Sequence, residues 1–318
     1  MHTTEARQVV GRLAPSPTGA QHVGNARTYL IAWLAARSRG GCLILRIEDI
    51  DSPRVKPGAA ELACADLHWL GLDWDEGPVV QSQRLDLYES ALAMLRDREL
   101  VYPCTCSRAD VERAASAPHA EHEEPVYPGT CCRRRVADAG ALTDVPYAWR
   151  FRVPPGPVDF VDGFHGPTRL DLHEAGGDFV VWKSAGTPAY QLAVVVDDAA
   201  QGVTEVVRGD DLVSSTPRQL LLYQALGLRP PSFTHVPLVV GPDGRRLAKR
   251  HGDTRLAALR AAGVQAEALV GLLAWSCGWI DRPRPVAAPE LLALYRLKAI
   301  PRQPFVLRPE HLQAIGYG

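Results

Sequence analysis

The order of apolar and polar positions predicts a strand, a helix and a second strand at the start of the chain. "QVVGRLAP" (residues 8–15) is a short apolar run, and "CLILRIED" (residues 42–49) is apolar at almost every position until it ends in charge. Between them, "NARTYLIAWLAARSR" (residues 25–39) has apolar residues at helical spacing and ends at Gly40-Gly41, a good helix stop. Near-continuous apolar strands joined by a helix are typical of a βαβ unit in a parallel sheet.

The pattern predicts further elements along the chain. Amphipathic helices are expected over residues 58–72 and 84–100. Residues 190–212 are expected to form buried strands separated by a turn, and residues 215–227 a capped helix. Beyond residue 253 the chain is mostly helical in pattern. Strands and helices that alternate in this way predict the α/β class.

The character of the chain changes between Cys104 and about Tyr190. Prolines and glycines are frequent there and helical periodicity is weak, while "YAWRFRV" (residues 147–153) and "VDFVDGFHG" (residues 158–166) alternate like antiparallel strands. This region therefore indicates a separate α+β domain inserted into the first one.

Composition limits the possible partners and the compartment. The 318 residues carry a formal net charge of -1, so a nucleic acid would have to meet a local basic patch. No window approaches the ~18 consecutive apolar residues of a membrane span. The N-terminus has no basic head followed by a long apolar run, so we expect a cytoplasmic protein without a membrane partner. Seven cysteines, an odd number, argue against a disulfide framework in such a protein.

The turn between the first strand and the first helix is rich in residues suited to binding an anion. It contains Pro15, Pro17, Gly19, His22 and Gly24. Backbone N–H groups at a helix N-terminus and the helix dipole favour a phosphate, and an imidazole there can donate a hydrogen bond to a developing oxyanion. The turn lacks the P-loop and dinucleotide-fold motifs, so neither of those nucleotide sites explains it.

The stretch "APSPTGAQHVGNAR" (residues 14–27) resembles the "HIGH" signature of class I aminoacyl-tRNA synthetases, in the form found in the glutamyl and glutaminyl branch. Further similar stretches follow in the same order: "RIEDID" (46–51), "YQLAVVVDD" (190–198), "GVTEVVRGDDL" (202–212), "TPRQLLLYQALG" (216–227) and "RLAKRHGD" (246–253). The last occupies the place of the "KMSKS" loop. Asn25 replaces the last His of the first signature and Ala248 the usual Ser of the second, whereas Lys249 keeps its charge.

The resemblance implies a Rossmann-like catalytic domain in two halves, residues 1–103 and 190–240. An inserted zinc-containing α+β domain, residues 104–189, would interrupt it. The KMSKS-like loop and a helical, stem-contact-like C-terminal region would follow, residues 241–318.

The implied reaction is attack of an amino acid carboxylate on the α-phosphate of ATP, with Mg²⁺ accompanying the ATP. Because the substrate carries the nucleophile, the protein needs positioning and charge stabilisation. Arg12 and Arg208 stand near strand ends, at the sheet edge where α/β folds bind ligands, and arginine pairs well with carboxylates. Glu48 could take the ammonium of glutamate and Tyr190 could offer its hydroxyl. The implied catalytic residues are His22 and Lys249; the implied glutamate site is Arg12, Leu13, Ala14, Pro15, Ser16, Glu48, Tyr190 and Arg208; the implied ATP site is Thr18, Gly19, His22, Gly24, Asn25 and Lys249. Structural ion pairs, a core tyrosine and a solvated basic loop are the alternative interpretations of these residues.

Four of the cysteines cluster in "CTC" (residues 104–106) and "YPGTCC" (residues 127–132). Tetrahedral zinc takes four N, S or O ligands, and closely spaced cysteines supply them. The resemblance implies a structural zinc ion held by Cys104, Cys106, Tyr127 and Cys131. His119, His122 and Cys132 are alternative ligands, and reduced cysteines without a metal are the remaining interpretation.

The length of the chain favours one branch of this family. It ends about seventy residues after Lys249, too soon for a large anticodon-binding region, and resembles the stand-alone glutamyl-Q tRNA(Asp) synthetases. That resemblance implies activation of glutamate without tRNA and esterification of queuosine at the wobble position of tRNA-Asp, by a monomer. Candidate phosphate contacts to the anticodon stem-loop are the basic segment 132–138, Arg150 and Arg152. The alternatives are a truncated glutamyl-tRNA synthetase that charges a tRNA 3′ end, and a catalytically dead zinc-containing RNA-binding module.

Overall fold

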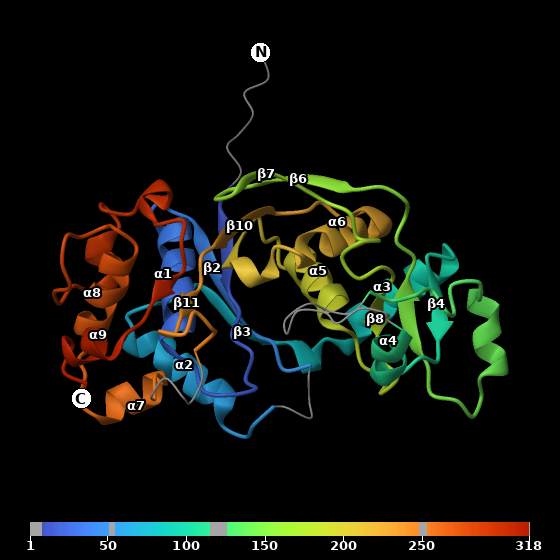
Figure 1. Ribbon diagram of the computed structural model, residues 1–318, viewed down its shortest axis with the longest axis horizontal. Helices are drawn as coiled ribbons and strands as arrows, with labels where there is room; N and C mark the ends of the chain where they lie inside the picture. The colour runs from blue at the N-terminus through green and yellow to red at the C-terminus, as the bar shows by residue number, and fades with distance from the viewer. Residues whose placement is uncertain (1–7, 51–54, 115–125, 248–252, 318) are drawn as a thin grey trace, which may run out of the picture. The chain divides into compact units, whose positions relative to one another are not determined.

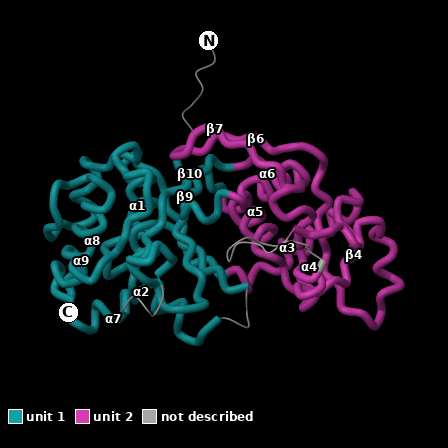
Figure 2. The backbone as a smooth tube through the Cα atoms, in the orientation of Figure 1, with its two compact units in different colours: residues 1–80, 202–213, 231–318 teal, residues 81–201, 214–230 magenta. Residues whose placement is uncertain are grey.

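The computed structural model describes residues 8–50, 55–114, 126–247 and 253–317. These residues divide into two compact units, which Figure 2 colours separately. Unit 1 comprises residues 1–80, 202–213 and 231–318, and unit 2 comprises residues 81–201 and 214–230. The predicted domain boundaries at residues 103, 189 and 240 differ from these divisions and stay predictions.

Unit 1 begins with the predicted strand–helix–strand. Strand β1 (Val10–Leu13) pairs in parallel with β2 (Cys42–Ile47), and α1 (Val23–Arg37) connects them. Gly11 lets α1 pack closely on β1, because a Cβ there would lie 3.3 Å from the Cβ of Ala36. The predicted βαβ unit is therefore confirmed, with the helix two residues earlier than the sequence pattern indicated.

Three further strands of unit 1 lie on either side of this pair. The chain continues through α2 (Ala59–Trp69) to β3 (Glu76–Val80), which pairs in parallel with β2. On the far side of β1, the Thr204 amide donates to the Val10 carbonyl over 2.9 Å. That bond places β9 (Glu205–Gly209) next to β1, and β9 pairs in parallel with β10 (Ser232–Val236).

Strands β3-β2-β1 form one hydrogen-bonded sheet and β9 and β10 pair in another, while the Thr204–Val10 bond sets β9 beside β1. Across the neighbours β3-β2-β1-β9-β10, the chain order falls to β1 and then rises from β9, so the topology switches between β1 and β9. A crevice outside the carboxyl ends of strands at such a reversal is where open α/β folds bind ligands. The residues that follow β1 and β2 lie at this edge, because the two strands run in register from Val10–Cys42 to Leu13–Leu45.

The C-terminal part of unit 1 is less helical than expected, because much of the chain after Ser276 forms turns and loops. It contains α7 (Leu256–Ala261), α8 (Ala266–Ser276) and α9 (Pro309–Gln313), which lie together in the orange and red part of Figure 1. Arg27 of α1 is 1% exposed and ties α1 to this region, since its Nε donates to Ser276 Oγ over 3.0 Å. The pattern had not indicated the short parallel pair β11 (Val239–Val240) and β12 (Phe305–Val306).

Unit 2 combines two antiparallel arrangements with three longer helices. One is the sheet of β4 (Val101–Cys104), β5 (Ala148–Phe151) and β8 (Phe179–Trp182), with β5 in the middle. The other is the hairpin of β6 (Val158–Asp162) and β7 (Gly166–Leu170). The helices are α3 (Leu85–Asp97), α5 (Tyr190–Ala200), α6 (Ser215–Leu226) and the short α4 (Arg108–Ala114). The antiparallel strands predicted between Cys104 and Tyr190 are thus confirmed.

One predicted element is wrong. The apolar run after Tyr190 was expected to be a strand, and it forms α5. Leu192 to Asp198 are all buried, so helix and strand leave the same continuous apolar pattern in the sequence. Asp197 inside the run is fully buried and accepts hydrogen bonds from Gln81, Arg84 and Tyr88 over 2.7–2.8 Å.

Among the described residues, none of the helices combines the length and the apolar character needed to cross a membrane.

Candidate functional site

His22 is the N-cap of α1. Its Nδ1 accepts hydrogen bonds from the backbone amides of Gly24 (3.1 Å) and Asn25 (3.4 Å). In return, the His22 amide donates to Asn25 Oδ1 over 3.1 Å, which completes a capping box. Two amides that a helix N-terminus would otherwise leave unpaired are satisfied by the imidazole itself.

This arrangement fixes the tautomer of His22. A nitrogen that accepts two N–H bonds carries no proton, so the proton of the neutral ring sits on Nε2. Burial of the ring and the positive charge of Arg246 both lower the pKa of His22 and favour the neutral form. The site therefore offers a neutral N–H donor from Nε2, on the side of the ring opposite to the helix.

Gly24 and Asn25 contribute to the same cap. A Cβ at Gly24 would lie 2.9 Å from Cε1 and 3.0 Å from Nδ1 of His22, closer than real side chains approach. Gly24 therefore makes room for the imidazole of His22. Asn25, the departure from the "HIGH" pattern, holds the His22 backbone in place.

The segment that carries Lys249 is attached to this loop at its C-terminal end. Lys249 and Ala248 lie outside the described residues. After them, the Val23 amide donates to the Thr254 carbonyl (3.0 Å) and the Leu256 amide to the Gln21 carbonyl (2.9 Å). His22 and Arg255 thus form an antiparallel bridge.

The N-terminal end of the same segment is also held in unit 1. Arg246 pairs by its backbone with Val240 and by its side chain with Asp211. Leu247 and Asp253 are the described residues that border the segment on either side.

Arg12 and Arg208 lie at the β1–β9 junction. Arg12 Nη1 donates to the Val207 carbonyl over 3.0 Å, which brings the two arginine-bearing strands together. Arg208 Nε donates to Nε2 of the fully buried His235 over 2.9 Å, and its guanidinium lies 5.2 Å from the ring centroid of Phe233. Both side chains are buried, with 7% and 4% exposure, as expected for a desolvated carboxylate site.

Glu48 lies beside the opening loop, as predicted. Its amide donates to the Pro15 carbonyl over 3.0 Å. Its Oε1 lies 3.1 Å from Nη2 of Arg46, whose side chain is fully buried. The acid expected to meet an ammonium group is therefore also the partner of a buried guanidinium, in line with the structural ion pair that was the alternative interpretation.

Two further polar residues of this site were not predicted. Tyr29 of α1 donates its hydroxyl to Gln21 Oε1 over 2.9 Å, and Gln21 Nε2 donates to the Ser16 carbonyl over 3.4 Å. Burial and the charge of Glu48 raise the pKa of the Tyr29 phenol, which the charge of Arg12 partly opposes. The charges of Glu48 and Arg12, two of the proposed glutamate-binding residues, therefore act on the Tyr29 hydroxyl. The available signal was its position four residues after Asn25, on the same side of a helix.

The remaining predicted residues fall into two groups. The first group lies at the end of β1 and in the turn that connects it to the N-cap His22. It comprises Leu13, Ala14, Pro15, Ser16, Thr18 and Gly19. Tyr190 belongs to unit 2, where it is the first residue of α5 and is 38% exposed.

Three cysteines and one tyrosine gather in unit 2. The Sγ atoms of Cys104, Cys106 and Cys131 lie within 4.8 Å of one another. The Sγ atoms of Cys106 and Cys131 are 3.7 Å apart, and Cys104 Sγ lies 3.4 Å from the hydroxyl oxygen of Tyr127. Tetrahedral zinc with its usual Zn–S and Zn–O bond lengths would separate such atoms by about 3.8 Å and about 3.5 Å. The donor set therefore fits a zinc ion.

The Tyr127 oxygen is oriented as an acceptor. The Cys131 amide donates to it over 2.8 Å, an interaction that favours an oxygen ligand. Without a metal, burial and the neighbouring Cys104 raise the pKa of this phenol. The Cys131 thiol is also buried, but hydrogen bonds from the Thr105 backbone, Cys106 and Tyr127 outweigh burial and lower its pKa.

Of the three alternative zinc ligands, only Cys132 belongs to the described residues. His119 and His122 lie outside the described residues. Cys132 packs against the edge of the cluster but is absent from the group of mutually close sulfur atoms found among the described residues. Its neighbour Cys131 is the third member of the sulfur group, beside Cys104 and Cys106.

Arg150 and Arg152, two of the candidate RNA contacts, are held within unit 2. Arg150 Nε donates to Cys104 Sγ over 3.3 Å. Arg152 lies 4.6 Å from the ring centroid of Tyr102 and donates to the Cys132 and Arg134 carbonyls. Within the basic segment 132–138, Arg133 and Arg135 have exposed side chains.

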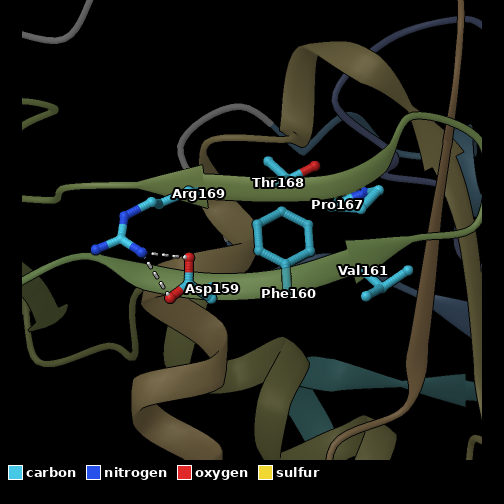
Figure 3. A pocket seen from close by; sticks show the side chains of 6 residues that line it. All are labelled: Asp159, Phe160, Val161, Pro167, Thr168 and Arg169. Atoms are coloured by element: carbon cyan, nitrogen blue, oxygen red, sulfur yellow. Dashed lines mark hydrogen bonds and ion pairs between the residues drawn. The ribbon is translucent and has the colours of Figure 1, made fainter.

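A hollow on the β6–β7 hairpin is a separate feature. Its volume is about 320 Å³, and its lining is drawn in Figure 3. Phe160 lies at its centre, and an exposed Arg169–Asp159 ion pair of 3.2 Å stands at one end. None of the residues predicted to bind glutamate, ATP or zinc lines it.

Comparison with known proteins places the whole chain in one family. Residues 8–282 match the family of class I tRNA synthetases (E and Q), catalytic domain. The glutamyl-Q tRNA(Asp) synthetase of Symbiobacterium thermophilum is 52% identical over 97% of this chain and 98% of its own. That of Rhodopirellula baltica is 55% identical over 85% of both chains. The crystal structure of the glutamate-tRNA synthetase from Elizabethkingia anophelis has a TM-score of 0.82 and 26% identity, over 96% of this chain and 69% of that chain. The chain therefore belongs to the class I tRNA synthetases of the glutamyl and glutaminyl branch and, within it, to the glutamyl-Q tRNA(Asp) synthetase family.

Proposed function

We propose that this protein is an ATP-dependent ligase that activates glutamate without tRNA and then transfers it to queuosine at the wobble position of tRNA-Asp. In the first step a carboxylate oxygen of glutamate bonds to the α-phosphorus of ATP, and the bond from that phosphorus to the pyrophosphate oxygen breaks. In the second, a queuosine hydroxyl takes the glutamyl group and AMP leaves. Full-length similarity to glutamyl-Q tRNA(Asp) synthetases supports both steps.

His22 is the proposed donor to the reacting phosphate. The single observation that carries this role is the capped imidazole, whose Nδ1 is occupied by two backbone amides so that Nε2 holds the proton. A donor fixed in advance and kept neutral by its surroundings costs no reorganisation during the reaction. Thr18, Gly19, Gly24 and Asn25 would complete the ATP site around it.

Lys249 is the proposed second phosphate contact. The attachment of its segment beside His22, through Thr254 and Leu256, supports a position facing the same phosphates. Its ammonium group would stabilise the negative charge that develops on the leaving pyrophosphate. Mg²⁺ would enter with the ATP and share that charge.

Glutamate would be held at the edge of β1, β2 and β9. Arg12 and Arg208 are the proposed partners of its carboxylates, because both are buried and arginine pairs with carboxylates in a fixed geometry. Glu48 is the proposed partner of the ammonium, while Leu13, Ala14, Pro15 and Ser16 would line the pocket. Tyr190 is the proposed hydroxyl donor, on the family resemblance.

Pyrophosphate exchange tests the first step. We expect exchange of labelled pyrophosphate into ATP with glutamate and no tRNA, and at least a hundredfold less with aspartate, whose shorter side chain cannot span the two arginines. Absence of exchange with glutamate would instead favour the catalytically dead RNA-binding scaffold.

Transfer to a short RNA tests the second step. An anticodon hairpin of tRNA-Asp that carries queuosine has no CCA end, so only the proposed acceptor is present. We expect this hairpin to accept labelled glutamate and the same hairpin with guanosine to remain unlabelled. Labelling of whole tRNA but not of the hairpin would support the alternative, charging of a tRNA 3′ end. A tRNA acceptor also implies a cytoplasmic location.

A structural zinc ion is the proposed occupant of the cysteine cluster. Cys104, Cys106, Tyr127 and Cys131 would hold it within the predicted α+β insertion. A closed set of four protein ligands leaves no position for a substrate, so the ion would stabilise the local fold and take no part in adenylate formation. Metal analysis of the purified protein should give about one zinc per chain, and no bound metal would refute this assignment.

A further inference from the structure

Arg150 is the only arginine that, among the described residues, touches two members of the proposed zinc set. It lies on β5, directly opposite Tyr102 of β4 and diagonal to Cys104. Its Nε donates to Cys104 Sγ over 3.3 Å, and its guanidinium carbon lies 3.9 Å from the ring centroid of Tyr127. A third contact, from Nη1 to the Asp178 carbonyl over 2.8 Å, fixes the plane of the guanidinium.

The charge of the donor set explains why a cation should stand there. When the three thiols and the phenol are deprotonated they carry four negative charges, and Zn²⁺ offsets only two of them. Cys104, Cys131 and Tyr127 are buried, so water screens the remaining charge poorly. Arginine stays protonated under all ordinary conditions, and its N–H groups can donate to a thiolate while its face lies on an aromatic ring.

We propose that Arg150 is a positioning residue of the zinc centre, whose Nε–H bond orients Cys104 Sγ and whose guanidinium fixes the ring of Tyr127 for coordination. This inference rests on the proposed zinc site. The expectation that Arg150 contacts RNA phosphates stays a separate prediction.

Zinc affinity of the full-length protein, measured by competition with a chromophoric chelator, tests the proposal. Partners that orient metal ligands typically contribute 10–100-fold in metal affinity. We expect Arg150→Met to weaken zinc binding by that factor. Arg150→Lys keeps the positive charge but loses the planar guanidinium, so it should recover part of the loss. Arg96→Met is the matched control. Arg96 lies 4.9 Å over the ring of Trp149, next to Arg150 on β5. It takes part in none of the contacts described for the zinc ligands, so its loss should leave zinc affinity unchanged.

Cobalt substitution provides a readout that a general loss of stability would not move. In the Co²⁺-loaded protein, the sulfur-to-cobalt charge-transfer band should shift when the hydrogen bond to Cys104 is removed, and should stay in place in Arg96→Met. Wild-type zinc affinity in Arg150→Met with an unshifted cobalt band would overturn the role of Arg150 while leaving the zinc site intact. A wild-type protein that binds neither metal would overturn the zinc site itself and this inference with it. Should Arg150→Met fail to fold, the affinity and band position of Arg150→Lys decide between these outcomes.

Discussion

At the scale of single residues, the site depends on a histidine that acts as a helix cap. A histidine is an unusual N-cap, and its use here couples the helix start to the chemistry of the ring. The amides of Gly24 and Asn25 occupy Nδ1, so local backbone geometry determines which nitrogen can serve a substrate. The sequence predicted that His22 meets a phosphate, but it could not reveal the tautomer, because that depends on hydrogen bonds made two and three residues away.

Gly24→Ala should disable the site with limited effect on the fold. The new Cβ would come within about 3 Å of the imidazole and push it off the helix end. We expect pyrophosphate exchange to fall at least tenfold. Thr28→Ala, one turn later on α1, is the control, since Thr28 only bonds back to the Gly24 carbonyl. Equal activity of the two variants would show that the position of the imidazole is unimportant.

A second prediction at this scale concerns Asp66 of α2. Its side chain is 1% exposed and its nearest cation, Arg260 of α7, is 3.7 Å away. Burial raises the pKa of this carboxyl from 3.8 to about 6, more than Arg260 lowers it. The folded protein thus binds the proton more tightly than the unfolded chain does, so ionisation costs stability as the pH rises from about 4 through about 6.

Asp66→Asn removes this ionisation. The free energy of unfolding of the variant, minus that of the wild type, should rise by up to about 3 kcal/mol between pH 4 and pH 7, given about 1.4 kcal/mol per pKa unit. Urea unfolding at several pH values measures it, and the pH 4 value corrects for any other effect of the asparagine. A difference that stays constant with pH would contradict the prediction.

At the scale of elements, the sequence located most helices and strands but misidentified α5. Its Leu192–Asp198 stretch is buried on all sides, so neither the period of a strand nor that of a helix is visible. The β1–α1–β2 unit was easier to predict because Gly40-Gly41 marks the end of the helix and charge marks the end of β2. The contacts of Arg46, Tyr29 and Arg150 could not be predicted, because each joins residues whose proximity depends on the folded sheets.

The cysteine cluster gives a prediction for the elements around it. β4, α4 and the segment near Tyr127 share a small apolar cluster with the proposed ligands, so a metal would supply much of their stability. Removing zinc with a chelator should lower the melting temperature by several degrees and leave at least half of the pyrophosphate exchange activity. Cys131→Ser should behave like the chelated protein, whereas Cys132→Ser, its neighbour outside the sulfur group, should retain zinc. Identical behaviour of the two variants would contradict the assigned ligand set.

At the scale of the whole molecule, the functional residues are divided between the two compact units. Unit 1 brings together the strand ends, the capped helix and the described residues that flank the Lys249 segment, Arg246 and 254–256. Unit 2 carries Tyr190 and the cysteine cluster. The order of motifs along the chain was enough to predict the family, since few sequences match all of them. The boundaries between the parts were harder, because α3, α5 and α6 join the compact unit that also contains the cysteines.

Pyrophosphate exchange by His22→Asn tests the central claim most directly. Asparagine is a good N-cap, so the variant keeps the helix start but loses the Nε2–H donor. We predict a melting temperature close to that of the wild type and an exchange rate with glutamate reduced by about 10²–10³, the usual cost of losing one transition-state donor. Wild-type exchange in this variant would show that the imidazole only caps α1 and takes no part in adenylate formation.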